Sequence, residues 1–239
     1  MAVASSIWQR RIERAQQLSG QHPFAEEILR FYVHVAGFQQ DLQLCVGTQR
    51  PSTEAEIDRA LAESELAELT SRFASFLSLA EEHGPQQLCA LGKDLRARGP
   101  VFWSELLNAT WSAERASDAQ AILALIVLQP YAELLQSRAS KRPSLNTYAV
   151  CPFCQRKPCV GVMRPLGDGA ARSLVCSFCV NEWEFRRIVC PGCGEEDDKK
   201  LPVYTASDFE YIRVECCESC KTYIKTGPDE ERPRRPARR

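Results

Sequence analysis

Four Cys-x-x-Cys pairs in the C-terminal part of the chain restrict its fold more than any other feature. Gaps of 21, 10 and 23 residues separate successive pairs. In chain order, the pairs are Cys151/Cys154, Cys176/Cys179, Cys190/Cys193 and Cys217/Cys220. Two residues between cysteines let one tight turn direct both sulfurs at the same metal ion. The long, short, long order of the gaps predicts two sites, each made by the two pairs that flank a long gap.

The residue types in and around these pairs favour metal binding. Four thiolates in a tetrahedral arrangement suit zinc, or iron of the rubredoxin kind. Proline and glycine in CPFC (residues 151–154) and CPGCG (190–194) are typical of such turns. Short strands bury little core, and structural zinc contributes about 10–16 kcal/mol in zinc-finger peptides. We therefore predict that the eight cysteines hold two metal ions, iron or zinc, with disulfides, thiol redox chemistry and an iron–sulfur cluster as alternatives.

The other four of the twelve cysteines are expected not to bind metal. Cys159 and Cys216 are interpreted as small, partly buried bystanders, and Cys45 and Cys89 as core residues of helices. In an alternative register Cys216 replaces Cys217 as a ligand. We keep Cys217, because it has the usual spacing of two residues from Cys220.

Residues 1–140 have the pattern of an all-α helical bundle. Apolar residues recur every three or four positions, as on one buried helical face: Phe24, Ile28, Phe31, Val35, Phe38 and Leu42. His83-Gly84-Pro85 is predicted to end one helix, and Gly99-Pro100 to separate two shorter ones. Residues 121–128 are apolar on all sides, so we expect them at the centre of the bundle. This apolar run is too short to cross a bilayer, which needs about 20 residues.

The predicted fold class is α+β, with the helical bundle followed by two tandem rubredoxin-like, zinc-ribbon modules. The predicted parts are a helical domain at 1–140, a linker at 141–149, metal modules at 150–188 and 189–226, and a disordered tail at 227–239. Gly167-Asp168-Gly169 predicts a hairpin turn. The predicted strands lie at residues 162–163, 173–175, 183–189, 203–205, 211–214 and 222–224.

The sequence gives reasons against a secreted protein and against an enzyme. Residues 1–20 contain no apolar run of the length found in signal peptides, so we expect a cytoplasmic, reduced protein. In that compartment, paired cysteines bind metal more often than they form structural disulfides. No nucleotide-binding or hydrolase motif is present, and a site closed by four cysteines has no open coordination position. We predict no catalytic residues and no further cofactor-binding residues.

The motifs together resemble the FdhE family of formate dehydrogenase accessory proteins. The similar segments are HPFAEEILRFY (22–32), LQPYAELL (128–135), CPFC (151–154), CSFCVNEWEFRRIVCPGCG (176–194) and ECCESCKTYIK (215–225). The resemblance implies a cytoplasmic assembly factor that binds the formate dehydrogenase catalytic subunit before export and has iron or zinc at the eight cysteines. Cys216 and Cys159 depart from the expected pattern. The resemblance implies neither nucleic-acid binding nor membrane insertion, and a homodimer remains open.

Two other functions remain as alternatives. An iron-dependent redox or electron-transfer module is suggested by the CPGCG turn. A nucleic-acid-binding zinc ribbon is suggested by residues 141–239, which have 18 Lys and Arg against 14 Asp and Glu. Eight thiolates and two divalent ions would bring the net charge of that segment from +4 to 0. The charge argument for nucleic acid is therefore weak.

Overall fold

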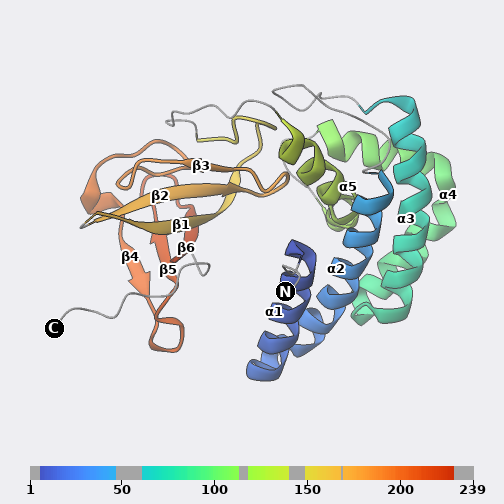
Figure 1. Cartoon of the computed structure of the whole chain (residues 1–239), viewed down its shortest axis with the longest axis horizontal. Helices are drawn as coiled ribbons and strands as arrows, with labels where there is room; N and C mark the ends of the chain where they lie inside the picture. The colour runs from blue at the N-terminus through green and yellow to red at the C-terminus, as the bar shows by residue number, and fades with distance from the viewer. Residues whose placement is uncertain (1–5, 47–60, 113–117, 140–148, 168, 229–239) are drawn as a thin grey trace, which may run out of the picture. The chain divides into compact units, whose positions relative to one another are not determined.

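The computed structural model describes residues 6–46, 61–112, 118–139, 149–167 and 169–228 (Figure 1). The chain divides into two compact units, a helical unit that ends at Arg138 and a sheet unit that begins at Ala139. The α+β prediction, with an all-α bundle before the cysteine-rich β modules, is therefore confirmed. The predicted linker lies almost entirely outside the described residues.

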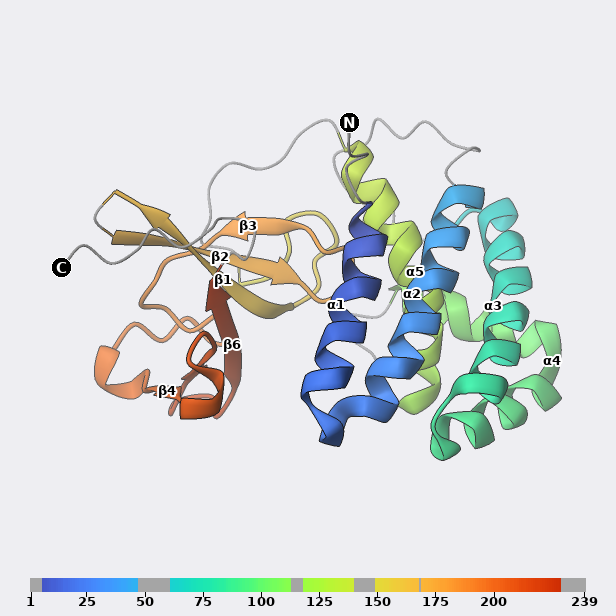
Figure 2. The same ribbon diagram turned by 60° about the horizontal axis from the view of Figure 1, so that its bottom comes forward.

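The helical unit contains five α-helices in its described part. They are α1 (Ile7–Gln21), α2 (Glu26–Val46), α3 (Glu63–His83), α4 (Gln86–Ser112) and α5 (Ala119–Arg138), with a 3-10 turn η1 (Pro23–Ala25) before α2. The side chain of Ser6 caps α1 by accepting a hydrogen bond from the backbone N–H of Gln9. Gly99 has a φ of 80° and interrupts α4 before Pro100, where the sequence predicts the break. Helix α5 packs against α2, α3 and α4 (Figures 1 and 2).

Helix α5 is the core helix of this unit. Leu123, Ala124, Val127 and Leu128 are fully buried, as expected for this apolar run, but Ile122 is 53% exposed, so the run is not buried on all sides. Among the described residues, α5 alone is long and apolar enough to cross a membrane by length and composition. Its burial against the neighbouring helices accounts for that composition.

One part of the predicted helical face is wrong. Phe24 and Ile28 are 83% and 51% exposed, whereas Phe31, Val35 and Leu42 are buried as expected. Phe24 lies in the 3-10 turn η1, whose three-residue period differs from that of α2. Sequence periodicity across Pro23 therefore extended the buried face too far towards the N-terminus.

The sheet unit is built on one six-stranded sheet (Figure 2). Its strands are β1 (Pro158–Leu166), β2 (Gly169–Cys176), β3 (Glu182–Glu184), β4 (Val203–Thr205), β5 (Arg213–Cys216) and β6 (Tyr223–Pro228), in the order β3-β2-β1-β6-β5-β4. Strands β1 and β2 form the hairpin predicted from Gly167 and Gly169. Strands β1 and β6 pair in parallel, and the other pairs are antiparallel. The parallel pair joins the first three strands to the last three.

Several predicted boundaries differ from the structure, and β1, β2 and β5 have other bounds than their predicted strands. Strand β3 ends at Glu184, so residues 185–189 do not extend it as predicted. The guanidinium of Arg172 binds the carbonyls of Arg186 and Val189, which fixes this segment in a turn. Strand β6 continues to Pro228, two residues into the predicted tail, and residues 229–239 lie outside the described residues.

Candidate metal centres

The structure gathers the eight predicted cysteines into two clusters. The first contains Cys151, Cys154, Cys176 and Cys179, and the second contains Cys190, Cys193, Cys217 and Cys220. Within each cluster, the four sulfurs lie within 4.8 Å of one another. Each cluster combines the two pairs on either side of a long gap, which is the grouping that the spacing predicts.

The sulfur–sulfur distances fit metal coordination. They are 3.6 Å for Cys151–Cys179 and 3.3 Å for Cys154–Cys176 in the first cluster, and 3.6 Å for Cys190–Cys220 and 3.7 Å for Cys193–Cys217 in the second. A regular tetrahedron with metal–sulfur bonds of zinc length has sulfurs about 3.8 Å apart. A disulfide would bring two sulfurs to about 2.05 Å. The donor set and the distances therefore fit zinc or iron.

All four turns share one backbone conformation. The residue after each second cysteine has a positive φ: Gln155 (61°), Val180 (57°), Gly194 (79°) and Lys221 (57°). The N–H of the first cysteine donates to the carbonyl five residues later in each turn, at 2.8–2.9 Å. Only one of the four positive-φ residues is glycine, so three turns hold side chains in a conformation that L-residues rarely adopt.

Backbone donors also point at the sulfurs. The N–H groups of Phe153, Phe178 and Gly192 lie 3.4, 3.3 and 3.2 Å from the sulfurs of Cys151, Cys176 and Cys190. Such bonds stabilise a thiolate relative to a thiol. These turns therefore favour the deprotonated ligands that a metal ion requires.

The first cluster lies inside the sheet unit. Cys151, Cys176 and Cys179 are buried, and Cys154 is half-buried. The buried guanidinium of Arg156 stacks on the ring of Phe178, with its Cζ 3.7 Å from the ring centroid. Cys154, Cys176 and Cys179 act on this guanidinium electrostatically.

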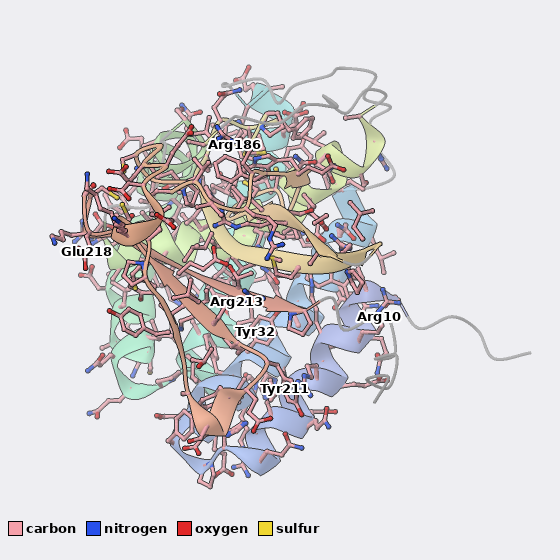
Figure 3. The ribbon with its side chains drawn as sticks, turned by 90° about the vertical axis from the view of Figure 1, so that its left-hand side faces the viewer. Arg10, Tyr32, Arg186, Tyr211, Arg213 and Glu218 are labelled. Atoms are coloured by element: carbon pink, nitrogen blue, oxygen red, sulfur yellow. The ribbon has the colours of Figure 1, made fainter. Side chains whose placement is uncertain are left out.

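The second cluster lies partly at the surface. Cys190 and Cys217 are buried, Cys220 is half-buried and Cys193 is exposed. The hydroxyl of Thr222 lies 3.0 Å from the sulfur of Cys220. Glu218, labelled in Figure 3, lies in the turn between Cys217 and Cys220.

The pKa shifts indicate how the sulfurs share charge. Hydrogen bonds with Cys151 and Cys154 raise the pKa values of Cys176 and Cys179, and hydrogen bonds with the other three sulfurs lower the pKa of Cys151. In the second cluster, burial raises the pKa of Cys190, and the hydrogen bond with Thr222 lowers the pKa of Cys220 to about 6. Four thiolates at these distances repel one another, so a divalent cation is needed for all four to be deprotonated.

The remaining cysteines lie outside both clusters. Cys216 is in β5, paired with Tyr223, and the cluster takes Cys217 instead, so the alternative register does not occur in the structure. Exposed Cys159 directs its thiol at the carbonyl of Val175. Cys45 is exposed and Cys89 is half-buried, so the expectation of two core cysteines is wrong.

Sequence reasoning missed two residues beside the first cluster. Arg156 follows Cys154 by two positions, and Asn181 follows Cys179 by two; the side-chain amide of Asn181 donates to the sulfur of Cys151 at 3.7 Å. A buried arginine has no signature in the sequence, because Arg156 resembles any surface arginine until Phe178 is seen to cover it.

The structure therefore defines a class of protein in which a helical bundle precedes two joined modules, each with a four-cysteine cluster able to hold a metal ion. Residues 150–187 match the family model described as FdhE, central domain. The resemblance to the FdhE family is confirmed by this match and by relatives similar over most of the chain.

The similar proteins cover both units. A protein FdhE homolog of Aquifex aeolicus is 23% identical over 90% of this chain and 80% of its own length. A homolog from Pasteurella multocida is 27% identical over 98% of this chain and 80% of its own length. The crystal structure of the FdhE protein from Pseudomonas aeruginosa matches with a TM-score of 0.61 and 21% identity, over 93% of this chain and 82% of that one. That match shows the same fold.

Proposed function

We propose that this protein is a cytoplasmic assembly factor that binds the catalytic subunit of a formate dehydrogenase before export. One observation carries the proposal: the similarity to FdhE homologs extends over both units, not over the cysteine modules alone. Zinc ribbons occur in proteins of many functions, so a match limited to them would define no function. Similarity that includes the helical unit supports a shared task.

We propose that the two clusters are metal sites with iron or zinc, and that the eight clustered cysteines are the ligands. The modules are assigned to residues 150–188 and 189–226. Four protein sulfurs complete a tetrahedral shell, so no coordination position remains for a substrate. This arrangement supports a protein that binds its client and catalyses no reaction.

We further propose that the partner is a protein, and that the chain binds neither a nucleic acid nor a membrane. Metal-bound thiolates remove the basic charge that would favour nucleic acid. The apolar side chains of α5 are used in the core of the helical unit. Both features support a protein surface as the site of contact.

Co-purification tests this function. The full chain, tagged and metal-loaded, is co-expressed with the catalytic subunit of a formate dehydrogenase. The expected result is a complex that survives size-exclusion chromatography, whereas an unrelated molybdoenzyme subunit of similar size does not bind. A metal-loaded, folded chain that never associates with the catalytic subunit contradicts the proposal.

An iron-dependent redox module is the second candidate. Exposure of Cys193 favours it, because a partner can approach the second cluster closely. Anaerobic purification decides between the two candidates. Iron with the absorption of a four-thiolate site supports the redox function. A colourless protein that contains zinc alone contradicts the redox function.

A further inference from the structure

The two clusters have the same four ligand atoms but different surroundings. We propose that the first cluster holds its metal permanently, whereas the second exchanges its metal with the solution and thereby controls the order of residues 190–222. This proposal rests on the metal ligation proposed above. It assigns the second cluster a regulatory role: the surface that surrounds it is ordered only while its metal is bound.

The two clusters differ first in how accessible their sulfurs are from solution. Cys151, Cys176 and Cys179 are at most 1% exposed and none of the four ligands is fully exposed, Cys154 being half-buried, so a chelator or an incoming thiolate reaches a metal among them mainly through local unfolding. In the second cluster Cys193 is exposed and Cys220 is half-buried. A competing ligand can therefore attack the second metal in the folded protein.

The two clusters also differ in how the charge of their metal–thiolate groups is compensated. A divalent ion with four thiolates has a net charge of −2, and a buried charge is costly unless an opposite charge compensates it. Arg156 supplies a buried positive charge beside the first cluster, held in place by the ring of Phe178. Asn181 adds a hydrogen bond to the sulfur of Cys151. These groups stabilise the metal-bound state of the first cluster.

The groups around the second cluster give less compensation. Arg172 acts electrostatically on Cys190, but its guanidinium lies 2.6 Å from the carboxylate of Glu215, so the pair adds no net charge. Glu195, two residues after Cys193, accepts a hydrogen bond of 2.5 Å from Ser219 and lies 3.5 Å from the ammonium of Lys200, so this pair adds no net charge either. Solvent is left to screen most of the charge of the second cluster.

Loss of the second metal would affect the surrounding chain because that chain has few buried residues. The large apolar side chains of this region are mostly exposed: Val203, Tyr204, Phe209, Tyr211 and Ile212. All three residues of β4 are exposed as well. A segment with so little core depends on its metal for order. Release of the metal therefore disorders the aromatic surface around Tyr211, labelled in Figure 3, without unfolding the first module.

The test uses the full chain loaded with two equivalents of zinc. Excess EDTA is added, and released zinc is followed together with amide hydrogen exchange by mass spectrometry. One equivalent is expected to leave first, while amides of residues 190–222 lose protection and those of 151–184 keep it. Release of both ions at one rate, earlier loss from the first cluster, or retained protection of 190–222 after one ion has left overturns the proposal.

Substitution of Arg156 tests the charge argument. Arg156→Gln is expected to accelerate release of the slow zinc about 10–100-fold, if the usual loss of metal affinity on removal of an outer-shell partner is expressed in the release rate. Arg186→Gln is the control, because Arg186 is exposed and pairs with Glu196. If Arg156→Gln does not fold, Asn181→Ala removes the other donor and is expected to act in the same direction. Unchanged slow release in a folded variant overturns the role of these residues.

The client protein does not enter this experiment. Failure to bind the formate dehydrogenase subunit would therefore leave the difference between the two clusters standing. Conversely, equal release rates would contradict the exchange proposal and leave the assembly function untouched.

Discussion

Arg172 in β2 and Glu215 in β5 form an ion pair of 2.6 Å that connects the two cysteine modules. The side chain of Arg172 is 2% exposed, and it also donates to the carbonyls of Arg186 and Val189 in the segment between the modules. One guanidinium thus contacts both modules and their connection. The two clusters belong to one continuous sheet because of such contacts and the parallel pair of β1 and β6.

Removing one partner of this pair should strongly destabilise the sheet unit. Glu215→Ala leaves the buried charge of Arg172 without a counter-charge, which typically costs about 3–5 kcal/mol. Chemical denaturation followed by tryptophan fluorescence measures the loss. Glu196→Ala, which removes the exposed partner of Arg186, is the control and should leave the unfolding midpoint unchanged. Equal midpoints for both variants would contradict the structural role of the pair.

The positive-φ residues allow a prediction in the stabilising direction. Lys221→Gly and Gln155→Gly replace exposed residues held at φ near 60° and should stabilise the metal-loaded protein, because an L-residue in this region costs about 1–2 kcal/mol. Gly194→Ala should destabilise it by a similar amount, since open space surrounds Gly194 and only its φ of 79° opposes the change. Thermal unfolding of the three variants checks the signs. A lower Tm for both glycine variants would show that the turns are not strained.

Gly161 is expected to tolerate no side chain. It pairs with Thr226 across the parallel β1–β6 contact, and a Cβ at residue 161 would overlap the hydroxyl of the fully buried Thr226. Gly161→Ala should cost about 1–3 kcal/mol through overpacking. Adding Thr226→Ala should restore part of this loss, which a thermodynamic cycle of the four proteins measures. If Thr226→Ala restores no stability, the loss in Gly161→Ala does not come from contact with Thr226.

Neighbouring cysteines provide a matched test of the ligand set. Cys217→Ser should remove one metal ion from the protein, whereas Cys216→Ser should leave the metal content unchanged, because only Cys217 belongs to the second cluster. Cys154→Ser should remove the first ion and unfold the sheet unit while the helical unit remains folded. Metal analysis with circular dichroism distinguishes these outcomes. Loss of metal on substitution of Cys216 would revive the alternative register.

The cysteine clusters could be predicted from the sequence because their chemistry is local. Spacing within a pair fixes a turn, and the gap between pairs fixes which turns meet, so the groups that contain Cys151 and Cys190 followed without tertiary information. The burial of Leu123, Ala124, Val127 and Leu128 followed from the apolar composition of their run, whereas the 53% exposure of Ile122 did not.

Features that depend on tertiary contacts could not be predicted. The parallel pairing of β1 with β6 joins strands far apart in the sequence. Each strand has the pattern of an ordinary short strand, which does not indicate its partner. Exposure of Phe24 depends on where η1 gives way to α2. Arg156 gains its role only from the ring of Phe178 and the nearby sulfurs.

Native mass spectrometry of the anaerobically purified full chain shows whether the two cysteine clusters hold metal ions. We expect a mass that includes two metal ions per chain, iron or zinc, with all twelve cysteines reduced after the metal is removed. A folded chain without metal, or one whose mass shows disulfides among the clustered cysteines, would contradict this expectation.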